Sequence, residues 1–257
     1  MTNAKKTSQP IISQYKISRD KCPKTDKETE EMNKVPYSNV VGSIMYLMVS
    51  TRPEIAYAIS VLSKYMSNLG KLNWLAMKWI FRYLIGTTDI GLVFKQSQNP
   101  TLVEGFCDSD YAGDRDTRRS TSAYYFLVWE NCISWKVQLQ PVVALSTTKA
   151  VYVSATEAIK EAVWIKGVLK ELKLLKSIPI IYSNNQSSIH LCKNHVFHDK
   201  TKHVEIKYHF IRDKVTQGEV TVEKVPTEHN PADMGTKVVT LSKFKHCMNL
   251  LGINKGD

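Results

Sequence analysis

The 257-residue sequence predicts an α/β fold in which helices cover a mixed β-sheet, preceded by a small helical subdomain. Strand-like runs separated by a tight turn follow one another from Val103 to Trp135, and strand–helix–strand alternation continues to Val225. Apolar residues at helical spacing between residues 36 and 86 predict helices before the sheet. A meander that passes into strand–helix–strand alternation combines antiparallel and parallel strands, which gives a mixed sheet.

The chain divides into three sections by composition. Residues 1–35 mix Lys, Thr, Glu and Asp with few apolar positions, which predicts a polar, basic and loosely packed N-terminal arm. Residues 36–100 form the helical segment, and residues 101–257 form the α/β domain, which ends in a helical stretch. Three apolar stripes predict the helices of the second section, and they run over Val40–Met48, Ile55–Met66 and Trp74–Leu84.

The strands of the third section are rich in β-branched and aromatic residues and end at turn residues. The first begins at Val103 and ends on the acidic run that starts at Asp108, and Glu130 and Asn131 form a hairpin turn farther along. The other predicted strands are Ala123–Trp129, Asn131–Trp135, Val142–Leu145, Ile178–Tyr182 and Val220–Val225.

A helix N-cap signal at Ser146 opens the long helix of this domain. Its apolar stripe runs to Leu172, and we expect the helix to cover residues 148–174. Shorter helices are predicted over Gln186–Cys192, over Val204–Thr216 and from Pro231 to Thr236.

Charge favours polyanionic partners, because 35 Lys and Arg face 24 Asp and Glu, a formal net charge of +11. No apolar run approaches the roughly 20 residues that span a bilayer, so no membrane partner is expected. The 5 cysteines are odd in number and contain no CxxC spacing, which indicates reduced thiols rather than a disulfide framework or a zinc knuckle. We therefore expect an intracellular protein, in the cytoplasm or nucleus.

Ordered blocks along nearly the whole chain carry a family resemblance. They include VPYSNVVGSIMYLM, TRPEIAYA, LNWLAMKWIFRYLIGT, DSDYAGDRDTRRSTSAYYF, CISWKVQLQPVVALSTTKAVY, NNQSSI, VFHDKTKHVEIKYHFIR and HNPADMGTK. These blocks resemble the C-terminal part of copia-type retrotransposon Pol polyproteins, where the end of the reverse transcriptase is followed by the ribonuclease H domain. The resemblance implies a ribonuclease H-like fold with a five-stranded mixed sheet, and it assigns residues 36–100 to the reverse-transcriptase connection.

The resemblance also implies two-metal phosphodiester hydrolysis, in which four carboxylates hold Mg²⁺ or Mn²⁺ ions roughly 4 Å apart. Two of these catalytic and metal-binding positions are retained as Asp108 and Asp233, and Asp110 is a further candidate metal ligand. The other two are Val151 and Asn184. Valine has no donor atom and asparagine lacks the formal charge, so we expect weak or absent metal binding.

Two further departures concern the same motifs. Lys149 replaces an acid of the pattern near the start of the long helix, which opposes cation binding. Gly235 stands where relatives carry a bulky apolar residue, and glycine is expected to loosen a helix there.

The leading hypothesis is a catalytically impaired ribonuclease H-like domain that binds an RNA:DNA hybrid or RNA. Basic residues in the motif loops are expected to contact phosphates, namely Arg118, Arg119, Lys200, Lys202 and Lys207. One alternative is an active Mg²⁺-dependent RNA:DNA hybrid ribonuclease. Another is a protein-interaction module adopted by a host, with a partner that the sequence does not identify, or a relic without a selected role.

Overall fold

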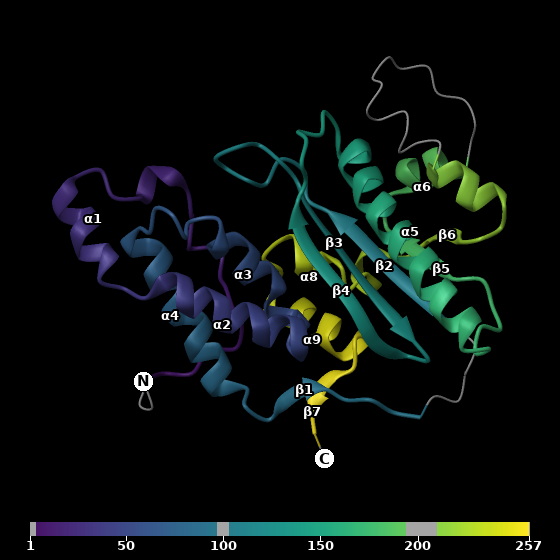
Figure 1. Cartoon of the computed structure of the whole chain (residues 1–257), viewed down its shortest axis with the longest axis horizontal. Coiled ribbons are helices and arrows are strands. Elements are labelled where there is room, and N and C mark those ends of the chain that lie inside the picture. The colour runs from purple at the N-terminus through teal and green to yellow at the C-terminus, as the bar shows by residue number, and fades with distance from the viewer. Residues whose placement is uncertain (1–3, 97–102, 194–209, 257) are drawn as a thin grey trace.

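The computed structural model describes residues 4–96, 103–193 and 210–256, and its centre is a five-stranded sheet with the order β4-β3-β2-β5-β6 (Figure 1). The strands are β2 (Val103–Ser109), β3 (Thr121–Val128), β4 (Asn131–Leu139), β5 (Ile180–Ser183) and β6 (Thr221–Lys224). β3 and β4 are antiparallel to their neighbours, whereas β5 pairs with β2 and β6 in parallel. This confirms the predicted ribonuclease H-like α/β fold with a mixed sheet.

Helices cover both faces of this sheet (Figure 1). α5 (Thr147–Glu171) begins at Ser146, whose hydroxyl accepts a hydrogen bond from Lys149 N, and it packs on one face beside α6 (Gln186–Lys193). The opposite face carries α8 (Asp233–Thr236) and α9 (Leu241–Leu250). Alternate residues of β3 pack into the cores on the two faces of the sheet, because successive side chains of a strand point to opposite sides. Phe126 packs in the α5 core, and Tyr125 packs in the core shared with α8.

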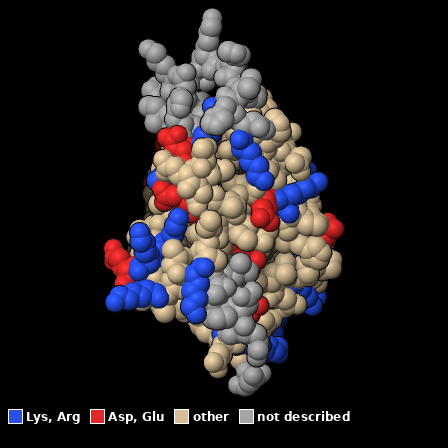
Figure 2. Space-filling view, turned by 90° about the vertical axis from the view of Figure 1, so that its right-hand side faces the viewer, with Lys and Arg blue, Asp and Glu red and all other residues tan. Residues whose placement is uncertain are grey.

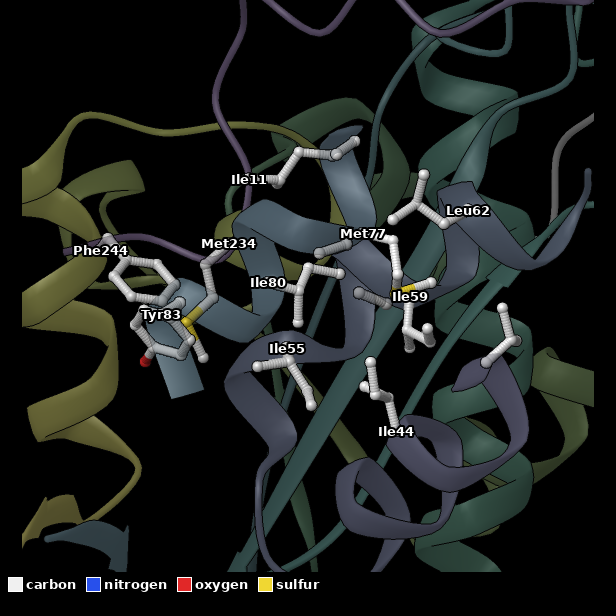
Figure 3. Packing of buried hydrophobic residues seen from close by; sticks show 14 of the residues in the cluster. Ile11, Ile44, Ile55, Ile59, Leu62, Met77, Ile80, Tyr83, Met234 and Phe244 are labelled. Atoms are coloured by element: carbon white, nitrogen blue, oxygen red, sulfur yellow. The ribbon is translucent and has the colours of Figure 1, made fainter. Parts of the chain in front are cut away.

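The helical segment shares its core with the α8 face of the sheet. It consists of α2 (Tyr37–Ser50), the 3-10 turn η2 (Pro53–Ile55), α3 (Ala56–Ser63) and α4 (Lys71–Gly86). Figure 3 shows Ile59, Met77 and Ile80 of α3 and α4 gathered near Met234 of α8. The ring of Tyr83 in α4 meets the ring of Phe244 in α9 edge to face, with ring centroids 6.2 Å apart. One apolar core therefore ties the helices to the sheet.

The N-terminal arm packs more closely than its composition predicts. It contains η1 (Arg19–Lys21) and α1 (Asp26–Asn33). The indole Nε1 of Trp79 donates to the backbone oxygen of Gln9 at 2.9 Å, and the Tyr15 ring meets Trp79 edge to face. Side chains of the arm are buried in the shared core, namely Ile11, Ile17, Cys22 and Met32. Four spaced apolar residues hold the arm in place although its sequence has no regular period.

Other differences from the predicted elements lie at strand ends. Residues 142–145 do not form the expected strand: they are irregular, and Leu145 is 77% exposed. β4 instead continues to Leu139, which uses the available edge of β3 before the chain turns toward α5. A small second sheet pairs β1 (Ile90–Leu92) with β7 (Ile253–Lys255), and the short turn η3 (Thr227–His229) precedes α8. The predicted helix over residues 204–216 is described only from residue 210 to 216.

Candidate functional site

Asp108 and Asp233 lie together beneath the surface. Asp108 comes near the end of β2 and is 3% exposed, and Asp233 opens α8 and is 2% exposed. Thr236, the last residue of α8, donates its hydroxyl to Asp108 Oδ2 at 2.7 Å. The structure therefore brings the two retained acids of the sequence motifs to one place.

Two lysines neutralise this carboxylate pair. Lys237 Nζ lies 3.0 Å from Asp233 Oδ1 and 3.4 Å from Asp108 Oδ2, so one ammonium group contacts both acids. Lys243 of α9 places its Nζ 2.9 Å from Asp233 Oδ2. Sequence reasoning missed both lysines. The spacing of four residues between Asp233 and Lys237 is the one signal that could have revealed the first.

Burial and neighbouring charged groups shift the pKa values of Asp108 and Asp233 in opposite directions. Burial raises the pKa of Asp108 to about 7, and the neighbouring Asp233 adds to the rise, while the charge of Lys237 opposes it. Burial also acts to raise the pKa of Asp233, but hydrogen bonds with Asp108, Lys243 and Lys237 outweigh it and leave that pKa lowered. Adjacent carboxyl groups cannot both ionise freely. Asp108 is therefore the acid that holds a proton more readily, and Asp233 is the stable anion.

The two substituted positions lie on elements that flank Asp108. Val151 is buried in α5, one turn before Ser154, whose hydroxyl donates to the backbone oxygen of Asp108 at 2.7 Å. Asn184 directly follows β5 and is half-buried. Tyr182 of β5 is the register partner of Phe106 on β2. Asn184 and Asp108 each come two residues after their member of this pair. Because β2 and β5 are parallel, Asp108 and Asn184 lie at the same edge of the sheet.

The donor atoms present do not fit a two-metal centre. Within the described ranges, no three His, Cys, Asp or Glu side chains are grouped so that they could hold a metal ion. Two hard divalent ions need several oxygen ligands with net negative charge. The Asp108–Asp233 pair offers two carboxylates, and the ammonium groups of Lys237 and Lys243 already contact them.

Asp110 begins the loop between β2 and β3, and the charge of Lys237, which contacts both acids of the pair, also acts on it. It accepts a hydrogen bond from the backbone N of Thr121, and burial raises its pKa to about 6. Asp110 lines a cavity of about 220 Å³ together with Tyr57 and Lys64 of the helical segment and its flanking turn.

Comparison with known proteins gives matches along 99% of the chain. The Pol polyprotein of transposon TNT 1-94 from Nicotiana tabacum is 46% identical over 254 residues, and that of transposon RE2 from Arabidopsis thaliana is 35% identical over 256 residues. The chain belongs to the Pol polyprotein family of copia-type retrotransposons. It spans 19% and 17% of the length of these two relatives. No family model matches the chain.

A ribonuclease H1 isolated from compost, LC11-RNase H1, is a similar solved structure, with a TM-score of 0.41 and 12% identity over 53% of this chain and 93% of that one. The strand order and the helix positions, rather than this distant match, define the fold of the Pol segment.

The basic residues predicted to bind nucleic acid are only partly described in this Pol segment. Arg118 and Arg119 lie in the β2–β3 loop, where Asp114 N donates to Arg119 O at 3.0 Å and Arg118 N donates to Asp114 O at 2.8 Å. Arg118 is exposed. The other three predicted contacts lie outside the described residues: Lys200, Lys202 and Lys207.

On the side of the molecule that carries α5, Lys and Arg alternate with Asp and Glu rather than forming one continuous basic field (Figure 2). Across the described ranges, no helix is long and apolar enough to cross a bilayer.

Proposed function

We propose that this Pol segment is a ribonuclease H-like module that binds an RNA:DNA hybrid, or RNA, without cleaving it. The observation that carries the proposal is the position of Lys237, whose ammonium group contacts both retained acids. The ammonium group of Lys237 balances the negative charge that a divalent metal ion would otherwise balance. Val151 and Asn184 remove two more negative charges from the same region, so binding of Mg²⁺ or Mn²⁺ is expected to be weak or absent.

Binding is supported by charge and by fold. The formal charge of +11 favours a polyanion, and A-form helices are recognised largely by shape and by contacts to phosphates and 2′-hydroxyls. The exposed Arg118 in the β2–β3 loop is available for a phosphate contact. Lys200, Lys202 and Lys207 belong to the same proposed contact set.

Hydrolysis of the hybrid is the second candidate function, because Asp108 and Asp233 do lie together. The purified chain and an Asp108→Asn control should be compared on a labelled RNA:DNA hybrid in Mg²⁺ and in Mn²⁺. The proposed function predicts equal, background cleavage for both proteins. Cleavage by the natural chain that disappears in the control would establish the hydrolytic function instead.

Binding is measured separately, by fluorescence anisotropy of the same hybrid over a salt series. Affinity should fall steeply between 50 and 200 mM salt, by about a hundredfold if roughly four phosphates are contacted. Arg118→Ala should weaken binding and reduce the salt slope. Lys255→Ala removes one positive charge on β7 and is the matched control, and it should change the affinity and the salt slope less than Arg118→Ala does. A flat salt response would overturn the binding proposal.

A further inference from the structure

A cavity of about 650 Å³ lies on the α8 and α9 side of the sheet. Residues of β2, β3 and β5 line it together with residues of the β1–β7 ribbon and the end of α9. Its volume falls in the range typical of small-ligand sites. Glu104, Phe106, Trp129, Glu130 and Tyr182 give it three aromatic rings and two carboxylates.

Two of the rings form a platform. Phe106 and Tyr182 are register partners on the parallel strands β2 and β5, so their side chains stand next to each other on one face. The rings stack with centroids 5.2 Å apart and planes inclined by 28°. Both side chains are half-buried, so each keeps surface that a ligand can cover.

The third ring sits on a strained turn. Trp129 and Glu130 connect β3 to β4, and both have positive φ, 54° and 64°. Two-residue turns of this kind favour Asn-Gly, because side chains larger than Asn rarely adopt left-handed backbone. Strain that places a tryptophan and a glutamate at a cavity points to a role for those side chains.

Asn131 fixes this turn against the segment that follows β1. Its Nδ2 donates to Trp129 O at 2.7 Å and to Lys95 O at 3.0 Å, and its Oδ1 accepts from Lys95 N at 2.7 Å. The cavity is therefore organised before any ligand arrives, which reduces the entropy lost on binding.

The charge of the cavity opposes that of the whole chain. Burial raises the pKa of Glu104, the charge of Glu130 raises it further, and a hydrogen bond with Tyr182 opposes the rise. The exposed residues Lys95 and His229 also line the cavity. Two carboxylates that disfavour each other's ionisation gain from a ligand that brings positive charge and hydrogen-bond donors.

We propose that this cavity binds the guanidinium group of an arginine side chain presented by a basic polypeptide. A planar guanidinium stacks on aromatic faces and makes paired hydrogen bonds to a carboxylate, which matches Trp129 with Glu104 and Glu130. A phosphate group would meet two carboxylates and be repelled. The site is thus separate from the proposed hybrid-binding function, and the two can fail independently.

The test uses the full chain and blocked arginine, N-acetyl-arginine methylamide, followed by isothermal titration and by tryptophan fluorescence. Saturable binding is expected, and the citrulline analogue, which has the same shape without the charge, should bind about tenfold more weakly or worse. Glu104→Gln and Glu130→Gln should each weaken arginine binding severalfold. Trp164→Phe, which alters an exposed tryptophan of α5, should leave the affinity unchanged.

Three results would each overturn the proposal: equal binding of blocked arginine and its citrulline analogue, no saturation by blocked arginine at tens of millimolar, or tighter binding of adenosine than of blocked arginine. The comparison of arginine with citrulline uses the natural chain and therefore needs no variant. Glu130 is exposed, so Glu130→Gln still tests the proposal if Glu104→Gln fails to fold. Hybrid binding should persist with the cavity saturated by blocked arginine, which separates this proposal from the binding function.

Discussion

Replacing Lys237 by methionine tests the electrostatic account of the carboxylate pair. Methionine keeps most of the length and apolar volume of the lysine stem and removes only the ammonium group. That group lies 3.0 Å from Asp233 Oδ1 and 3.4 Å from Asp108 Oδ2, and both acids are buried. Lys243 remains as a partner of Asp233 alone.

The magnitude follows from distance and exposure. At an effective dielectric constant of 20, the contact with the ionised Asp233 is worth about 5 kcal/mol before desolvation, and the contact with Asp108, whose pKa of about 7 leaves it about half protonated at pH 7, is worth about half as much. The side chain of Lys237 is 47% exposed, so solvent screening and the cost of desolvating the ammonium group cancel much of this. We expect a net loss of about 2 kcal/mol in the free energy of unfolding at pH 7, or about 4–8 °C in Tm for a chain of this size.

Thermal and urea unfolding of Lys237→Met measure the loss, and Lys255→Met is the matched control. Lys255 forms an exposed pair with Asp89 at 2.6 Å, and solvent screening leaves such a pair with little effect on stability. Added Mg²⁺ should raise the Tm of Lys237→Met more than that of the natural chain, because Asp108 has then lost its lysine contact and Asp233 keeps only Lys243. Equal losses for the two lysine variants would refute the assignment of Lys237 as the neutralising charge.

Three further outcomes follow from the same region. Because the pKa of Asp108 is raised to about 7 from an ordinary value of 3.8, the folded state keeps a proton that the unfolded chain has lost, so stability should fall as pH rises from about 4 to 7; unfolding at several pH values should show this fall flattened in Asp108→Asn. Gly235→Ala should destabilise by about 1–3 kcal/mol in urea unfolding despite the better helix propensity of alanine, because its Cβ would lie 2.7 Å from Ala123 Cβ and 2.9 Å from the Tyr125 hydroxyl; a more stable variant would show that α8 shifts away from β3 without cost. Val151→Glu with Asn184→Asp should gain Mg²⁺-dependent melting and hybrid cleavage that neither single change gives, and a folded double variant with neither gain would show that these positions do not converge on one site.

Regular patterns predicted the fold, and irregular contacts explain what they missed. The long stripe of α5 and the β2–β3–β4 meander carry strong periodicity, so the sheet and its main helix were predictable. The run Val142–Leu145 was not, because four apolar residues fit a strand or a loop equally well and only the extension of β4 to Leu139 decides between them. β1 and β7 pair across the length of the chain in strands of 3 residues each, too short to give a sequence period.

The candidate site was predictable to a similar extent. Family resemblance assigned Asp108 and Asp233 to one site, and the structure brings them together. No spacing rule connects Asp233 to Lys243, because the contact depends on the turn between α8 and α9. The sequence predicted that Gly235 loosens its helix, and the structure adds that its missing side chain leaves room for Ala123 and Tyr125 of β3. What sequence patterns leave open is therefore the tertiary placement of α8.

The helical segment bears on that placement, because α8 has only one turn and cannot fix its own position. Met234, the second residue of α8, packs in the core that Ile59 and Ile80 share with the sheet. Its neighbours Asp233 and Thr236 are thereby held against Asp108. The segment that resembles a reverse-transcriptase connection thus forms part of the support of the carboxylate pair. Changes in the α3–α4 core should alter the geometry between Asp108 and Asp233 without touching either acid.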